Sequence, residues 1–148
     1  MLKAVLDLFR DNPSDKPQTH TTELATAVLL SEIIRADREA DPRELEAYRA
    51  LLEKQFSLDA DELNALMNEG QTSAEEAVDM VQFTHVINQK CNIDEKQAIL
   101  TGLWEVAYAD KNIAPVEEHT IRRIADLLHL PHSQFIKTKL SVTEQSAG

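Results

Sequence analysis

The chain has 148 residues, of which 43% are hydrophobic and 28% charged, a composition typical of one globular domain. Lys and Arg total 15 against 26 Asp and Glu, so the formal net charge is −11. This charge excludes a nucleic-acid binder, which needs a basic surface to neutralise phosphates, and disfavours contact with an anionic membrane. Only 3 glycines and 5 prolines punctuate the sequence, too few for the turns of an all-β protein, so we expect an all-α fold.

Cysteine content and hydropathy indicate in which cellular compartment the protein is expected. Cys91 is the only cysteine, so no intramolecular disulfide can form, and its neighbours form no activating pair for a nucleophile. No apolar run approaches the ~20 residues of a membrane span. The first residues, MLKAVLDLFR, lack the small-residue cleavage site of a signal peptide. We therefore expect a cytoplasmic protein with no membrane span.

The N-terminal ten residues predict a short amphipathic helix that packs on the core of its own chain. Leu2, Val5, Leu6 and Phe9 fall at the i, i+3, i+4, i+7 spacing of one helical face. Residues 11–21 are polar and contain two prolines, which is typical of a linker.

Residues 22–140 predict the main domain, with halves at about 22–70 and 94–140 joined by a helix over 72–91. In the first half an apolar stripe begins near Thr22 and ends near Ala36. Asp41 followed by Pro42 is typical of a helix start, and Gly70 is expected to stop a later helix that Asp59 caps.

In the joining segment and second half, Thr72 or Ser73 is expected to cap the helix over 72–91. Asp94, Pro115 and Pro131 are expected to start the following helices. Trp104 lies in an apolar run and is expected in the core, and residues 141–148 are expected to be a disordered tail. The total is seven to eight helices in a single domain.

Two stretches of the chain repeat one acidic pattern at a constant offset. Each has a Glu inside a helix, an Ala-Asp pair at its end, and Pro-x-Glu at the start of the next helix. We therefore expect two pseudo-symmetric helical halves. The matching pairs, 73 residues apart, are Glu32 with Glu105, Asp37 with Asp110, Pro42 with Pro115, and Glu44 with Glu117.

Two interpretations of the repeated carboxylates are compatible with the sequence. An Asp at a helix C-terminus faces the negative end of the helix dipole, so both Asp37 and Asp110 need a compensating cation or backbone donors. The acids either serve as caps and turn ligands or form a patch for a divalent ion or a protein partner. An EF-hand is excluded, because Pro42 replaces the glycine and Tyr48 the glutamate of a calcium loop that starts at Asp37.

Motifs for catalysis and zinc are missing from the sequence. There is no glycine-rich phosphate loop, G-x-S-x-G, H-E-x-x-H or C-x-x-C. His119, His129 and His132 match no helical zinc spacing. We therefore expect a protein that is not an enzyme; a carboxylate-dependent hydrolase built on an acid pair such as Glu105 and Asp110 is the least favoured alternative.

The repeated motifs and the run IRRIADLLHLPHSQFIKTKL at 121–140 resemble the TerB-like (tellurite resistance protein TerB) family, in a small uncharacterised bacterial branch. LLSEIIRADREADPRELEAYRALLEKQFSL at 29–58 resembles the first half of the same family. The resemblance implies an all-α fold with two similar halves, a fold similar to the N-terminal cytoplasmic part of certain membrane-anchored J-domain co-chaperones. Arg38 and Lys111 stand where family members usually have Gly after Ala-Asp.

The resemblance also implies a negative surface that takes metal ions or partners. The residues that match it are expected to hold a divalent cation, Ca²⁺ or Mg²⁺ by their oxygen ligands with Zn²⁺ less favoured, or a protein partner. A role in the tellurite or envelope stress response follows from the family name, and a purely structural scaffold without metal is the main alternative. The expected metal residues are Glu32, Asp37, Glu44, Glu105, Asp110, Glu117 and Glu118.

Overall fold

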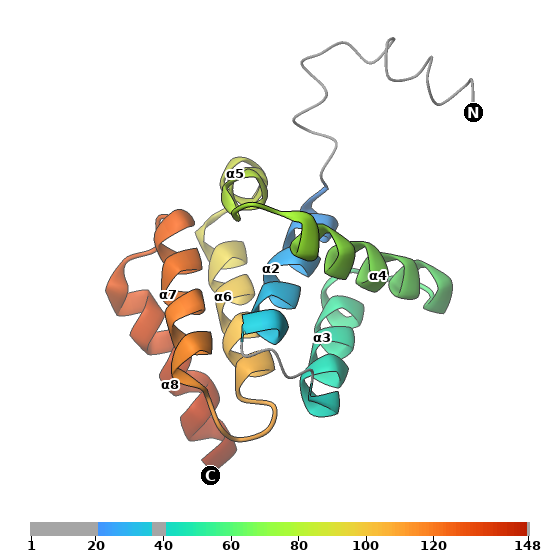
Figure 1. Ribbon diagram of the computed structural model, residues 1–148. Coiled ribbons are helices and arrows are strands. Elements are labelled where there is room, and N and C mark those ends of the chain that lie inside the picture. The colour runs from blue at the N-terminus through green and yellow to red at the C-terminus, as the bar shows by residue number, and fades with distance from the viewer. Residues whose placement is uncertain (1–20, 37–40, 148) are drawn as a thin grey trace, which may run out of the picture.

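A computed structural model describes residues 21–36 and 41–147 of the chain (Figure 1). Within these residues the fold is all-α, as predicted. The expected N-terminal helix over 1–10, the expected linker up to residue 20, Asp37 and Arg38 lie outside the described residues. The helices are α2 (Thr22–Ala36), α3 (Pro42–Gln55), α4 (Ala60–Glu76), α5 (Val81–Lys90), α6 (Ile93–Ala107), α7 (Pro115–Leu127) and α8 (His132–Ala147).

Helices α2 and α6 form the centre of the domain. They lie side by side in Figure 1, with α3 and α4 on one side and α7 and α8 on the other. Ten of the fifteen residues of α2 are buried, which is the pattern of a helix that is apolar around most of its circumference. Trp104 of α6 is fully buried, as predicted. The core therefore forms around two central helices rather than within either half alone.

The sequence repeat corresponds to a repeat of helices. α3 begins at Pro42 and α7 at Pro115, an offset of 115 − 42 = 73. α4 begins at Ala60 and α8 at His132, an offset of 132 − 60 = 72. Each half thus supplies three helices in the same order, and α5 lies between the two sets. Prolines at the first helical position have no N–H to leave unpaired, which explains why both equivalent helices start there.

The predicted stop at Gly70 and the predicted single helix over 72–91 are wrong. Helix α4 continues through Gly70 to Glu76, and α5 begins only at Val81. Gly70 is buried in the interface with α2, where a Cβ atom would lie 2.7 Å from the Cβ of Ala27 and 2.7 Å from the hydroxyl oxygen of Tyr48. The glycine serves a close helix approach and not a chain turn.

Two further predictions about helix ends are corrected by the structure. α6 begins at Ile93, one residue before the predicted start at Asp94, and its cap is Asn92. The Asn92 side-chain oxygen accepts the N–H of Glu95 at 2.8 Å, and the Glu95 carboxylate accepts the N–H of Asn92 at 2.8 Å. Residues 141–147 are part of α8 and not a disordered tail. Val142 is buried and extends the apolar stripe of α8 beyond Phe135, so packing supports the extra turns.

None of the described helices has the length and apolar character needed to cross a membrane.

Replacing Gly70 by Ala is expected to lower the free energy of unfolding by about 1–3 kcal/mol, because the new methyl group meets Ala27 and Tyr48 in a closely packed interface. The matched control is Gly102→Ala in α6, whose Cβ would lie 3.6 Å from the nearest atom, a methyl carbon of Leu51. That variant should gain up to about 1 kcal/mol from helix propensity alone. Urea unfolding followed by Trp104 fluorescence measures both, and a Gly70→Ala protein as stable as the parent would contradict the close approach.

Candidate functional site

The start of α3, which carries Asp41, and the turn after α6, which carries Asp110, lie at the same end of the molecule. Figure 1 shows the start of α3 and the turn between α6 and α7 together at the lower end. Asp41 caps α3 and its carboxylate also accepts from the Arg43 guanidinium at 3.0 and 3.2 Å. The pKa of Arg43 is raised, first by this hydrogen bond with Asp41 and further by the charges of Asp110 and Glu44. The negative charges of Asp41, Glu44 and Asp110 therefore all act on the Arg43 guanidinium.

Asp110 has a backbone donor in the turn that follows α6. Its Oδ1 atom accepts the N–H of Asn112 at 3.0 Å, which is an Asx turn. The next residue, Lys111, has φ 68°, a left-handed conformation that glycine adopts more readily than other residues. The unfavourable helix dipole at Asp110 is thus offset by the Asn112 N–H and by the field of Arg43.

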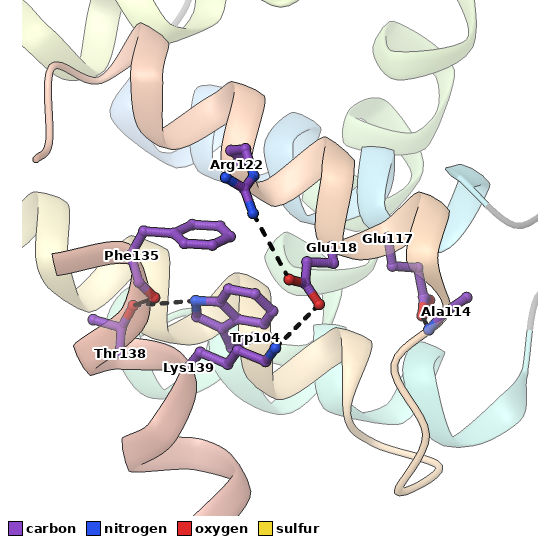
Figure 2. A network of polar contacts seen from close by, with 8 residues as sticks. All are labelled: Trp104, Ala114, Glu117, Glu118, Arg122, Phe135, Thr138 and Lys139. Atoms are coloured by element: carbon purple, nitrogen blue, oxygen red, sulfur yellow. Dashed lines mark hydrogen bonds and ion pairs between the residues drawn. The ribbon is translucent and has the colours of Figure 1, made fainter. Parts of the chain in front are cut away.

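Glu44 and Glu117 occupy the same position in α3 and α7, and both are only 1% exposed. The Oε1 atom of Glu117 accepts the N–H of Ala114 at 2.8 Å, a contact visible in Figure 2. A glutamate at the third helical position that reaches back to the N-cap N–H is half of a capping box. Glu117 therefore has the capping role that the sequence analysis gave as one of two alternatives. The spacing of the two glutamates in the sequence does not predict that both are buried.

Glu118 belongs to a cluster that joins α6, α7 and α8 (Figure 2). Its carboxylate accepts from Lys139 at 3.1 Å and pairs with Arg122 at 3.9 Å. Lys139 also lies 5.7 Å from the ring centre of Trp104, and Arg122 lies 4.9 Å from that of Phe135. Glu118 thus positions the Lys139 ammonium over the ring of Trp104 and the Arg122 guanidinium over the ring of Phe135.

Glu32 and Glu105, the acids inside the central helices, face different neighbours. Glu32 pairs with Arg35 at 3.0 Å. Partial burial raises the pKa of the Glu105 carboxyl, and the nearby Lys54 of α3 acts in the opposite direction. The two equivalent acids therefore have different charged neighbours.

No group of three or more His, Cys, Asp or Glu side chains is arranged to hold a metal ion in residues 21–36 and 41–147; Asp37 lies outside this range. His132 stacks on Phe135, with ring centres 5.5 Å apart, and His129 follows α7 with φ 61°. His119 is exposed on α7. The three histidines thus occupy separate positions at the surface or at helix ends.

The connection between α4 and α5 forms a surface that the sequence analysis missed. Val78 is 99% exposed and Val81 is 53% exposed. Val78 lines a cavity of about 150 Å³, together with Glu32, His119 and Arg123. Glu75 and Glu76 come before the two valines in the chain, and Asp79 lies between them. We call Glu75, Glu76, Val78, Asp79 and Val81 the α4–α5 surface.

The cap role of Glu117 gives a test of whether the repeated glutamates maintain the fold. Glu117→Ala is expected to lower the free energy of unfolding by about 1–3 kcal/mol, because the partly buried N–H of Ala114 loses its acceptor. Glu117→Gln keeps an oxygen acceptor and should recover most of that loss. Urea denaturation of the three proteins decides the matter: if Ala and Gln cost the same, the hydrogen bond does not explain the residue.

Comparison with known proteins adds one finding to this geometry. The family model described as Tellurite resistance protein TerB matches residues 23–140. That range covers helices α2 to α7 and most of α8, including both acidic turns. No curated protein and no solved structure matches the chain. Because the matched range includes most of the chain and both halves of the repeat, the chain belongs to the TerB family.

Proposed function

We propose that the chain is a non-enzymatic cytoplasmic domain that binds a protein partner through the α4–α5 surface. The observation that carries this proposal is the exposure of Val78, at 99%, together with that of Val81, at 53%. Exposed apolar side chains that are close in the chain and flanked by charged residues are typical of protein interfaces. The cavity beside them offers space for one inserted side chain of the partner.

The charge of this region indicates the chemistry of the partner. Residues 55–84 contain seven acidic residues and no Lys, Arg or His, which is a large part of the net charge of −11. Asp61, Glu69, Glu75, Glu76 and Asp79 are exposed there. We therefore infer a basic partner segment that also carries an apolar side chain, since opposite charges speed association and fix orientation.

The repeated acids support this proposal by their structural roles. Asp110 is bonded within its turn and Glu117 caps α7, while Glu32 and Glu118 are paired with basic side chains. Such contacts favour a scaffold over a carboxylate-dependent hydrolase, which requires two carboxyl groups facing one substrate bond. Only Glu32 among these acids borders the proposed interface, through the cavity beside Val78. We place the resulting complex in the tellurite or envelope stress response on the family's name alone.

Affinity capture from the native cell extract tests the interface. We expect the parent chain to retain a partner that Val78→Asp releases, because a carboxylate at the centre of the patch removes the apolar contact and must be desolvated. The retained partner should also dissociate as salt is raised, since exposed charge pairs are screened.

The control is Leu140→Asp on α8, which places the same carboxylate on another exposed apolar side chain, 42% exposed and far along the chain from the α4–α5 surface. It should retain the partner as the parent does. Equal capture by Val78→Asp and Leu140→Asp, whether both bind or neither does, would reject the α4–α5 surface as the binding site.

A divalent cation at the acidic turns is a second candidate function. It follows from the sequence-based expectation, and the contributions of Glu44 and Asp110 to the raised pKa of Arg43 indicate that carboxylates from the start of α3 and from the turn after α6 lie near the same side chain. The ligands would come from the predicted set that includes Asp37, Glu44 and Asp110, and their oxygen atoms suit Ca²⁺ or Mg²⁺.

Thermal unfolding with chelator and then with millimolar Ca²⁺, Mg²⁺ or Zn²⁺ tests this second candidate. An ion that binds only the folded chain adds about 2.7 kcal/mol of stability at a hundredfold excess over its dissociation constant. The rise in midpoint should disappear in Asp110→Asn and persist in Asp126→Asn, which removes an exposed carboxylate of α7. A midpoint unaffected by every ion leaves the acids as caps, turn ligands and ion pairs.

A further inference from the structure

A second cavity lies where the chain enters the described domain. It has a volume of about 230 Å³ and is lined by residues of α2, the end of α3, the end of α5 and α6. Thr22, the first residue of α2, lies at its edge, and Phe56, Cys91 and Ile99 provide apolar lining. For comparison, an apolar cavity of about 150 Å³ accommodates benzene. The groove is therefore large enough for an aromatic side chain.

We propose that this groove, lined by Phe56, Cys91 and Ile99, is the docking site of the chain's own N-terminal segment, residues 2–9. Residues 2–9 lie outside the described part of the chain. Leu2, Val5, Leu6 and Phe9 have the spacing of one helical face, and an apolar face of this kind is expected to pack against other apolar surface.

Connectivity and charge both favour this occupant. Thr22 lines the groove itself, so the segment is attached at the groove's edge by a tether of about a dozen residues, which keeps its effective concentration high. Residues 1–10 carry Lys3 and Arg10 against Asp7, a net charge of +1 (2 − 1), whereas the whole chain carries −11. Glu95 lies among the lining residues and offers a negative group to this basic segment.

Cys91 is a built-in reporter for this docking. It is partly buried in the groove lining and is the only cysteine of the chain, so a maleimide reports its accessibility without any engineered label. In the full chain, Leu6→Asp should release the segment and raise the alkylation rate of Cys91. If the segment covers the groove in about nine molecules of ten, the rise is about tenfold. A carboxylate left near Cys91 would lower thiolate formation and thus change the rate in the opposite direction.

The matched control is Ala4→Asp, which adds the same charge about 150° around the helix from the centre of the apolar face. Its alkylation rate should equal that of the parent. Leu6→Ser serves as a second, uncharged release variant, and far-UV circular dichroism checks that the domain stays folded in each protein. The parent rate should not depend on protein concentration, because the tethered segment acts within one chain.

Three results would overturn the proposal. Equal rates in the parent, Leu6→Asp and Leu6→Ser would show that the segment does not cover Cys91. Equal acceleration by Leu6→Asp and Ala4→Asp would show that the apolar face is not what docks. A rate in the parent that falls as its concentration rises would assign the groove to a second copy of the chain.

Discussion

The burial of α2 is the constraint on which the rest of the structure depends. With ten of its fifteen residues buried, this helix has contacts on nearly every side, and α3, α4, α5, α6 and α7 all pack on it. Such crowding requires small residues at the closest crossing, and Ala27 and Gly70 meet there. The same crowding leaves little room for charge at the centre, so the polar groups of the repeat are found mainly at helix ends, where backbone donors are available to them.

The repeated acids are explained by where each lies relative to a helix end. Glu117, at the start of α7, satisfies a backbone N–H that no helix bond reaches. Asp110, after the end of α6, opposes the helix dipole and is compensated by Asn112 and by the charge of Arg43. Glu118 lies on the outer side of α7, where Lys139 and Arg122 balance its charge. One sequence signature thus combines residues of different physical roles, and its regular spacing reflects the repeated helix–turn–helix geometry.

Much of the fold could be predicted from the sequence because its helices carry local signals. Prolines 42 and 115 mark two helix starts correctly, and the constant offset between them predicts the paired halves. The errors arose where tertiary packing overrides a local signal. Glycine is a residue that commonly ends helices, but Gly70 lies inside α4 where that helix packs closely on Ala27. The polar C-terminal residues are helical because Val142 is buried. The exposure of Val78 could not be predicted at all, since a valine beside an apolar run gives no indication of whether a neighbour covers it.

The two halves differ most where we place the interface, and this bears on where function resides in a repeated fold. α4 contains no basic residue, whereas its counterpart α8 contains Lys137 and Lys139. Lys139 pairs with Glu118 of α7 and lies over the ring of Trp104. This basic residue of α8 therefore contacts the core of the second half. α4 instead keeps its carboxylates at the surface and leads through the exposed Val78 to α5, which has no counterpart in the repeat. The shared elements build the domain, and the elements that break the symmetry are free to bind a partner.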